Sequence, residues 1–343
     1  MIVSFYDKNF KGLQDNASLV VAKDSYSLVK RPVEMNTISC VCEAFTEDIQ
    51  PTFLVIQNNK GGYIYGCLAG IPLLNEKNQT EINGTDLKSM LSSDVILDVT
   101  SYITVNDYIN YVFNQWKEQV NQDSFNVELI YNENVGTITM TDLKPSATEK
   151  DVYNAYDEIA KYLKFYNLYI DSKIDLINKK VIFTIGVTMW KNKNLNIRLS
   201  DYGIKNYGKW VADTNECQGY YNNNGSWTDG YKWILTSNNK ITTTESLRDI
   251  YPIKRKVIIN TESLDKANEE SLTELLNSLY NENIELNADD ILTDNASFET
   301  KFSIYLKKGQ GLYKELPCGE LHYNANGLTK VQIGYRYSGV EFI

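Results

Sequence analysis

The chain has 343 residues, of which 43% are hydrophobic and 23% charged, and its formal net charge is −10. This length suits two or three domains that each bury a core, and the composition is ordinary for a folded protein. The negative charge argues against specific nucleic-acid binding, because phosphate recognition needs clustered Lys and Arg, and the basic run Lys254-Arg255-Lys256 is more typical of the solvated end of a strand.

Residues 1–100 predict short strands broken by turns. Apolar residues dominate 53–56 and 63–65, and the segment between them, Asn58-Asn59-Lys60-Gly61-Gly62, is a strong hairpin signal. A short helix is expected to begin at Thr85, with its inward-facing residues being Leu87, Met90 and Leu91. We interpret this region as a first β-rich domain, a small barrel or sandwich.

Residues 101–190 predict a compact α+β module with two helices. The first helix begins at a capping-box-like Thr104-Val105-Asn106-Asp107. Its apolar residues follow helical spacing at Val105, Tyr108, Ile109, Val112, Phe113 and Trp116. A second helix is expected to begin near Thr148, with the same spacing at Val152, Ala155, Tyr156, Ile159, Ala160 and Leu163.

Each helix of this module is followed by a predicted pair of strands. The first pair covers 125–131 and 137–141, and the second covers 168–176 and 180–187. A repeated order of helix, strand and strand can place two helices on one face of a four-stranded antiparallel sheet. We therefore expect an intervening α+β domain of that form.

Residues 191–343 return to a β-rich pattern with one helix. The helix is expected over 265–280, with its inward-facing residues being Leu272, Leu275, Leu276 and Leu279. Alternation over 329–337 predicts a late strand that places Val331, Ile333 and Tyr335 on one face. The fold class predicted for the whole chain is α+β, with two β-barrel-like domains on either side of the module.

Few residues suggest chemistry. His322 is the single histidine, and no G-x-G-x-x-G, P-loop, G-x-S-x-G or H-E-x-x-H pattern is present, so we predict no enzyme and no catalytic residue. Two groups of carboxylates lie close together in sequence, and neither has a neighbouring histidine or a metal-ligand spacing. They are Glu43, Glu47 and Asp48, and Asp289 and Asp290. A glycoside hydrolase that uses two carboxylates brought together by the fold stays a less favoured alternative.

Cysteine usage points away from metal sites and disulfides. Cys40 and Cys42 share one face of a strand, but the other thiols, Cys67, Cys217 and Cys318, do not form the second pair of a zinc site. We therefore predict free thiols, no metal and no cofactor. No signal peptide and no membrane-spanning apolar stretch are found, which predicts synthesis and folding in a cytoplasm.

Aromatic residues provide the best candidate for a binding surface. Tyrosine is abundant, with 25 residues against 11 Phe, and it suits both strand surfaces and interfaces that become buried on assembly. An exposed loop or hairpin tip is predicted over 220–231, where a possible contact surface comprises Tyr220, Tyr221, Trp227 and Tyr231, with Trp233 nearby. These side chains could contact sugar or protein, or could pack on their own sheet, and both interpretations stay open.

Several segments resemble siphophage tail-tip hub proteins, also called tail-associated or prophage tail proteins, which are similar to the baseplate hub of contractile-tailed phages. In the first region the resembling segments are Ser4-Phe5-Tyr6-Asp7, Tyr63-Ile64-Tyr65-Gly66, Ala69-Gly70-Ile71 and residues 82–91. Later ones are residues 233–243 and Arg248-Asp249-Ile250-Tyr251-Pro252-Ile253. The motifs are turn-and-strand patterns spread over most of the chain.

The resemblance implies a virion structural protein at the tail tip, made in a bacterial cytoplasm. It implies a homotrimer that closes the tail tube, with two β-domains per subunit forming a pseudo-sixfold ring that matches a hexameric distal tail protein. Further implied partners are the tape-measure protein and downstream receptor-binding or fibre proteins. The sequence ends at Ile343 without an appended peptidase or lysozyme domain, so wall-degrading activity is not expected. The main alternative is a carbohydrate-binding receptor-recognition subunit that uses the aromatic tip.

Overall fold

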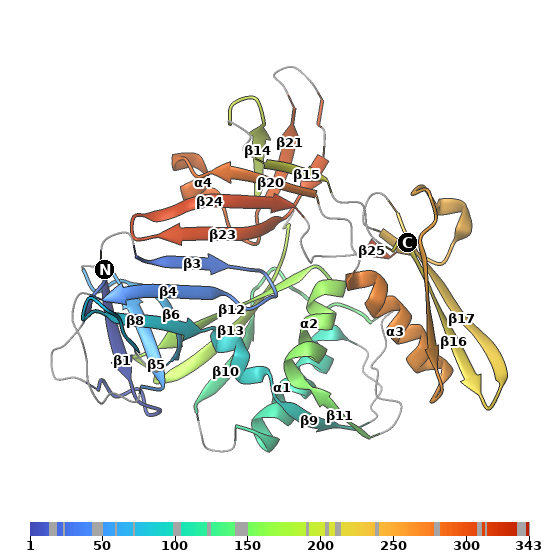
Figure 1. Cartoon of the computed structure of the whole chain (residues 1–343), viewed down its shortest axis with the longest axis horizontal. Coiled ribbons are helices and arrows are strands. Elements are labelled where there is room, and N and C mark those ends of the chain that lie inside the picture. Colours follow the sequence, from blue (N-terminus) through green and yellow to red (C-terminus); the bar gives the residue numbers. More distant parts are fainter. Residues whose placement is uncertain are drawn as a thin grey trace.

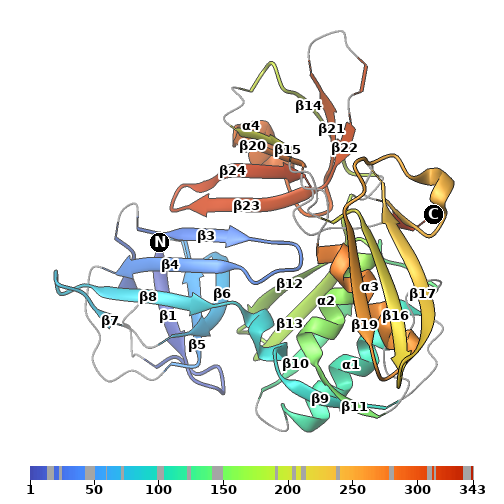
Figure 2. The same cartoon turned by 45° about the vertical axis from the view of Figure 1, so that its right-hand side comes forward.

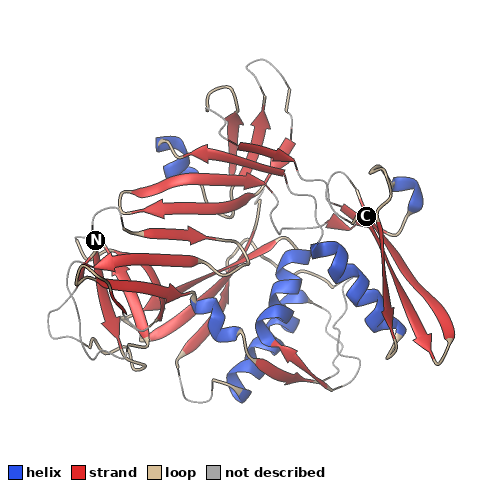
Figure 3. Cartoon of the chain, in the orientation of Figure 1, coloured by secondary structure: helices blue, strands red, loops and turns tan. Residues whose placement is uncertain are grey.

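A computed structural model gives the fold of the chain. It describes residues 1–13, 19–22, 25–42, 51–58, 60–70, 73–98, 104–121, 125–140, 150–189, 192–202, 206–209, 214–236, 240–277, 282–306, 311–312, 314–334 and 341–342. Strands predominate, and the longer helices gather in the centre and to one side of the molecule (Figures 1 and 3).

The first β-rich region forms an antiparallel part of the largest sheet. The predicted hairpin is confirmed as β5 and β6, whose turn is held by Asn58, because its Oδ1 accepts hydrogen bonds from the backbone N–H groups of Lys60 and Gly62. The strands are β1 (Ile2–Tyr6), β2 (Leu19–Val20), β3 (Ser27–Lys30), β4 (Thr37–Cys42), β5 (Phe53–Gln57), β6 (Tyr63–Ala69), β7 (Leu73–Leu74) and β8 (Thr80–Thr85).

The short helix expected from Thr85 is a 3-10 helix, η1 (Leu87–Leu91). It begins two residues later than predicted because Asp86 serves as its N-cap and accepts a hydrogen bond from the Lys88 N–H. Leu87 and Leu91 are buried, as predicted, and Met90 is partly buried.

The module contains both predicted helices, and they pack against each other. All six apolar residues predicted for the first helix are buried. The elements of the module, together with the strand just before it, are β9 (Asp94–Leu97), α1 (Val105–Gln119), β10 (Val127–Tyr131), β11 (Asp151–Asn154), α2 (Ala155–Phe165), β12 (Leu168–Asp175) and β13 (Lys180–Val187).

The predicted start of the second helix is wrong. Val152 lies in β11, where it pairs with Ile96 of β9 and is exposed, and the helix begins only at Ala155. Asn154 forms the N-cap, accepting a hydrogen bond from the Asp157 N–H. Residue Thr148 lies outside the described residues.

The four-stranded antiparallel sheet predicted for the module is also wrong. The described strands form a three-stranded sheet in the order β10-β13-β12, in which β10 is parallel to β13 and only β12 is antiparallel to it. In the segment predicted as the partner of β10, Thr139 makes an isolated bridge with Thr104, and Thr141 lies outside the described residues. The β10 strand therefore pairs across the module instead of with its neighbour in sequence.

The last region supplies two groups of strands. One group extends the largest sheet and adds a small sheet of β14, β21 and β22, while the other is a five-stranded sheet covered by α3. The elements are β14 (Asn194–Arg198), β15 (Asn206–Lys209), β16 (Glu216–Asn223), β17 (Ser226–Leu235), β18 (Lys240–Thr242), η2 (Glu245–Leu247), β19 (Arg255–Asn260), α3 (Leu264–Asn277), β20 (Glu282–Asn287), α4 (Asp290–Asn295), β21 (Lys301–Tyr305), β22 (Lys314–Leu316), β23 (Cys318–Asn324), β24 (Gly327–Gly334) and β25 (Glu341–Phe342).

Two predicted elements of this region are present, and each begins one or two residues earlier than predicted. In α3, Leu272 and Leu275 are buried, while Leu279 and the Leu276 side chain lie outside the described residues. Strand β24 contains the buried Val331 and Ile333, and residues 335–337 of the predicted strand lie outside the described residues.

One sheet joins the two β-rich halves of the chain. Strand β3 of the first half pairs antiparallel with β23 of the last half, so the sheet runs from β15 at one edge to β2 at the other. Figure 1 shows these strands stacked along one side of the molecule. The α+β character is as predicted, but the described strands form no closed barrel, because the pairing path is open at both ends.

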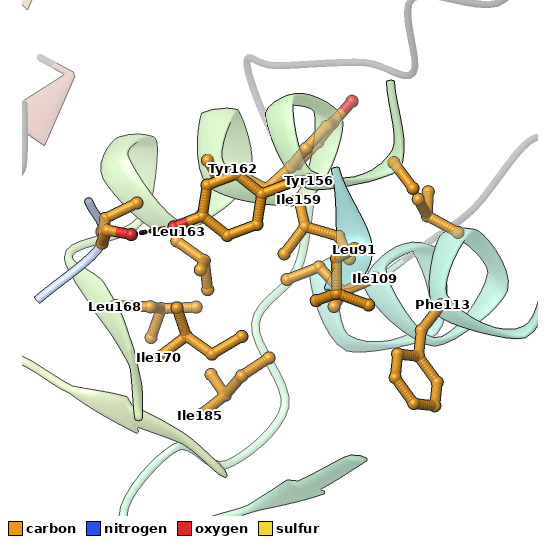
Figure 4. Close-up of a cluster of buried hydrophobic side chains, with 14 of the residues drawn as sticks. Leu91, Ile109, Phe113, Tyr156, Ile159, Tyr162, Leu163, Leu168, Ile170 and Ile185 are labelled. Atoms are coloured by element: carbon orange, nitrogen blue, oxygen red, sulfur yellow. Dashed lines mark hydrogen bonds between the residues drawn. The ribbon is translucent and has the colours of Figure 1, made fainter. Parts of the chain in front are cut away.

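The largest core lies between the helices and the module sheet (Figure 4). Ile109 of α1 and Ile159 and Leu163 of α2 are buried there, against Ile170 and Ile185 of the sheet. The Tyr156 hydroxyl donates a hydrogen bond to the Val33 carbonyl in the β3–β4 loop. The module thus packs directly on the first β-rich region.

Candidate interaction surface

The predicted aromatic tip is a β-hairpin formed by β16 and β17 at one end of the molecule (Figure 2). The turn residues Asn224 and Gly225 have φ of 49° and 91°, which is the left-handed backbone of a two-residue hairpin turn. Asn222 stabilises the turn because its Oδ1 accepts a hydrogen bond from the Gly225 N–H at 2.9 Å.

The hairpin belongs to a sheet that is covered by a helix on one face only, as far as the described residues show. Helix α3 packs on β16, β17 and β19. A Cβ placed on Gly219 would lie 2.4 Å from the Ala267 carbonyl oxygen of α3, so Gly219 faces the helix. Because strand residues alternate, the next residue, Tyr220, points to the opposite face.

The structure separates the candidate aromatic residues into pairs. Tyr220 and Trp227 form an edge-to-face contact with centroids 6.5 Å apart, on the face opposite α3. Tyr231 forms a similar contact of 5.3 Å with Trp233, whose Nε1 donates to the Asn268 carbonyl oxygen of α3. Local packing therefore accounts for Trp233, which is buried.

Exposure identifies which of these side chains a partner could reach. Trp227 is 54% exposed and Tyr231 is 58% exposed, while Tyr220 and Tyr221 are half-buried. Local packing is therefore established for Trp233. Contact of Tyr220, Tyr221, Trp227 and Tyr231 with a partner stays a prediction.

Two further residues, which the sequence motifs did not indicate, extend the apolar surface next to Tyr220. Strand β19 runs parallel to β16, so Val257 lies beside Gln218 and Ile259 beside Tyr220. Both Val257 and Ile259 are exposed. The alternation of 255–260 could have suggested an exposed strand, but only the long-range pairing places it beside the hairpin.

A buried carboxylate holds one end of this sheet in place. Glu216 is fully buried and accepts charge-assisted hydrogen bonds from Arg248 and from Arg255 at the start of β19. Lys256 forms an ion pair of 2.5 Å with Glu274 on α3. The basic run 254–256 therefore lies at the end of a strand, as predicted, and two of its charges are matched within the chain.

Two of the residues considered for catalysis, His322 and Asp289, make hydrogen bonds to neighbouring side chains or cap a helix. His322 lies in β23, with its Nε2 2.9 Å from a carboxylate oxygen of Glu320, and the same carboxylate group accepts a hydrogen bond from Arg31. Asp289 caps α4 and accepts a hydrogen bond from the Tyr202 hydroxyl at 2.9 Å. Residues Glu43, Glu47 and Asp48 lie outside the described residues.

All five cysteines are buried free thiols. Burial raises the pKa of Cys217 to about 11, and it raises the pKa values of Cys67 and Cys318 further. These three thiols are therefore protonated near neutral pH and poorly suited to nucleophilic chemistry. Among the described residues, no group of His, Cys, Asp and Glu is arranged to hold a metal ion.

Within the part of the chain that the structure describes, no helix has both the length and the apolar character needed to cross a membrane. By sequence, the chain matches no protein-family model and no curated protein.

By structure, the chain is similar to proteins of phage tails. It matches the tail protein from Neisseria meningitidis MC58 with a TM-score of 0.54 and 12% identity, covering 100% of this chain and 99% of that chain. It matches the 43 kDa tail protein of prophage MuSo2 from Shewanella oneidensis with a TM-score of 0.53 and 12% identity, covering 98% of each chain. It matches a chain of the phage P2 baseplate with a TM-score of 0.51 and 12% identity, covering 97% of this chain and 98% of that chain. The predicted resemblance to phage tail and baseplate proteins is therefore confirmed at the level of the fold, over nearly the whole chain.

Proposed function

We propose that this chain is a structural hub protein of a phage or prophage tail tip, which trimerises to close the tail tube and connects it to the host-binding apparatus. The observation that carries the proposal is the structural similarity to tail and baseplate proteins, which extends over almost the full length of this chain and of each chain compared with it. A match of that extent covers both β-rich regions and the module, whereas a shared single domain would cover only part of each chain.

The proposed hub has three parts, which are residues 1–100, 101–190 and 191–343. The first and last parts would form adjacent segments of a pseudo-sixfold ring, with the α+β part as an accessory domain between them. The pairing of β3 with β23 supports this arrangement, because it holds the two β-rich parts side by side in one sheet. In such a ring the proposed partners are the hexameric distal tail protein, the tape-measure protein and receptor-binding or fibre proteins.

The test is the mass of the protein in solution, alone and mixed with a distal tail protein encoded beside it. Light scattering of the protein alone is expected to give three times the chain mass of 39.3 kDa, or, where the trimer forms only on the partner, a complex with the mass of the distal tail ring plus three copies of this chain. Association entropy opposes the trimer, so the neighbouring ring can be needed before the contacts outweigh it. A protein that stays monomeric both alone and with its partner would contradict the proposal.

A second candidate function is recognition of carbohydrate by the aromatic hairpin. Exposed Trp227, beside Tyr220 and Asn222, favours it because an aromatic face with neighbouring amides suits a sugar ring. Glycan-array binding that is lost in Trp227→Ala and retained in Ile177→Ala, which alters an exposed apolar residue on a distant turn, would support this function. An array without binding by the wild-type protein would exclude it for the glycans tested.

A further inference from the structure

Strand β19 combines an open edge with an exposed apolar face. It forms one end of the five-stranded sheet, and its only strand partner among the described residues is β16. Val257 is 47% exposed and Ile259 is 54% exposed, and they continue the surface formed by Tyr220 and Trp227. In a folded protein, a strand edge next to exposed apolar side chains is normally covered by another element, or is kept from pairing with other chains by charged residues, proline or a bulge.

The charge at the start of this strand is positive. Lys254 is exposed and makes no ion pair with any described residue, and Arg255 remains partly exposed although it contacts Glu216. We call Lys254, Val257, Ile259, Tyr220 and Trp227 the β19 patch. The patch is apolar over Val257 and Ile259, and Lys254 adds a positive charge at the start of the strand. The exposed Asp229, which lies opposite Tyr220, adds a negative charge on the side of β17.

A second strand pair of the same chain, formed by β9 and β11, also exposes apolar side chains, but it carries a negative charge where the β19 patch carries Lys254. In the two-stranded sheet of β9 and β11, Asp94 and Ile96 are exposed, while the residues that alternate with them, Val95 and Leu97, are buried. Ile96 lies opposite Val152, which is 59% exposed. We call Asp94, Ile96 and Val152 the ribbon patch. Asp94 makes no ion pair within the described part of the chain, so the patch is apolar with an acidic end.

One edge of this ribbon is capped and the other is open. The Gln119 side chain of α1 accepts a hydrogen bond from the Ile96 N–H at 2.8 Å and donates one to the Ile96 carbonyl at 2.9 Å. The amide therefore occupies the outer edge of β9 as a neighbouring strand would. Strand β11 has no second strand partner among the described residues. The Val152 N–H donates to the Asp151 carboxylate, which also pairs with Lys266 of α3. Among the described strands, further pairing of the ribbon is therefore possible only on the β11 side.

We infer that the ribbon patch of one subunit docks on the β19 patch of a neighbouring copy. Each patch offers exposed β-branched side chains beside a strand edge that pairs with no further described strand, so pairing β11 with β19 would bury apolar area and add backbone hydrogen bonds between the chains. The acidic end of the ribbon matches Lys254 at the start of β19, on the side of the patch away from Asp229. This contact rests on the proposed homotrimer and assigns the surfaces that form it.

The two patches lie on different elements of one chain, so the contact is heterologous. A heterologous contact repeated around an axis gives a closed ring or an open filament, depending on the rotation between copies. A contact between two identical patches would instead stop at a dimer. The presence of two unlike, complementary patches therefore fits a ring of more than two subunits.

The experiment places one charge in each patch. Ile259→Asp alters the β19 patch, Val152→Asp alters the ribbon patch, and Ile177→Asp, at a turn residue that is 92% exposed outside both patches, is the matched control. All three positions are exposed, so circular dichroism and thermal unfolding are expected to match the wild type. Sedimentation equilibrium should show that each patch variant dissociates into monomers at concentrations at least tenfold above those needed for the wild type, while the control assembles normally.

Mixing the two patch variants gives a sharper result. The Ile259→Asp subunit keeps its ribbon patch and the Val152→Asp subunit keeps its β19 patch, so one intact contact can form between them. The mixture is expected to contain dimers and no trimers, although neither variant dimerises alone.

The outcomes separate this contact from the proposed function. Trimers that persist in both patch variants would overturn the contact and leave the homotrimer standing. Loss of assembly in Ile259→Asp alone would show that the ribbon plays no part and would also overturn it. A wild-type chain that is monomeric alone and with its distal tail partner would overturn the homotrimer, and the contact with it.

Discussion

At the scale of single residues, the joint between the first β-rich region and the module depends on a buried ion pair. The Lys88 ammonium lies 3.3 Å from the Asp86 carboxylate, and both side chains are fully buried. Lys88 also donates to backbone carbonyls of the β3–β4 loop, and Asp86 accepts from the Asn36 N–H and from Ser172 of β12. Burial lowers the pKa of Lys88, and the neighbouring carboxylate opposes that shift. Every charge in the joint therefore depends on its partner.

Removing one partner of this pair should be costly. Asp86→Ala would leave the buried Lys88 ammonium without its nearest counter-charge, with only Asp171 and Glu34 acting from farther away, and we expect the free energy of unfolding to fall by about 3–5 kcal/mol. Asp94→Ala, at an exposed aspartate, should change it by less than about 0.5 kcal/mol. Urea unfolding followed by fluorescence measures both, and a loss below about 1 kcal/mol in Asp86→Ala would show that the joint does not depend on this pair.

A tyrosine at the seam between the two β-rich halves should make stability depend on alkaline pH. Tyr323 of β23 pairs with Leu28 of β3, and burial raises the pKa of Tyr323 from 10.0 to about 12. Between these values the unfolded chain releases a proton that the folded chain retains, so stability falls as pH rises from 10 to 12.

Replacing Tyr323 measures how much of the pH dependence of the free energy of unfolding comes from its hydroxyl. Tyr323→Phe removes the titrating hydroxyl, and the loss of stability between pH 10 and 12 should be smaller than in the wild type by up to about 2 kcal/mol. Unfolding measured at pH 8, 10 and 11.5 tests this. An unchanged slope would mean that the hydroxyl is not protected in the folded protein.

At the scale of elements, close approach of α3 to its sheet depends on glycine. Gly219 of β16 and Gly230 of β17 both lie under the helix, where a Cβ would come within 2.4 Å of the Ala267 oxygen or 2.3 Å of the Asn268 side chain. The Ala267 contact is with backbone, which cannot move without shifting the helix. Glycine is therefore required at position 219 because a larger side chain would clash with α3, and not because of its backbone conformation.

Substitution at Gly219 should separate the helix from the sheet. Gly219→Ala is expected to lower the free energy of unfolding by about 1–3 kcal/mol through overpacking. Gly12→Ala is the control, since a Cβ there would meet no atom within 4 Å. Thermal unfolding of the two variants measures the difference, and equal melting temperatures would contradict the close contact.

At the scale of the whole molecule, the module and one shared sheet connect all parts of the chain. Lys30 pairs with Asp171 at 2.7 Å between β3 and the module, and Arg31 pairs with Glu320 at 2.9 Å across the seam. Glu299 of the last region accepts hydrogen bonds from Asn132 and Tyr169 of the module. Unfolding one part would therefore expose buried contacts of the others.

This connectivity predicts a single cooperative unfolding transition. In scanning calorimetry the calorimetric and van't Hoff enthalpies should agree, because no part can unfold while its sheet partners remain folded. Glu320→Ala removes the acceptor of Arg31 at the seam, and it should lower the transition temperature without dividing the peak. Two resolved transitions in the wild-type protein would show that the β-rich halves fold independently.

The sequence by itself determined the elements that depend on local patterns. The apolar spacing of α1, the Asn-rich turn between β5 and β6 and the aromatic hairpin were all predictable, because helical periodicity and turn chemistry act over a few neighbouring residues.

Only the tertiary structure decided which strands meet. Residues Asp151–Asn154 pair with β9 although their spacing suits a helix, β10 pairs in parallel with β13, and β3 joins β23 across nearly the whole chain. The exposed surface of Val257 and Ile259 likewise depends on the pairing of β19 with β16. Strand partners and exposed faces are set by contacts between residues far apart in sequence, and the free energy of those contacts outweighs local preference.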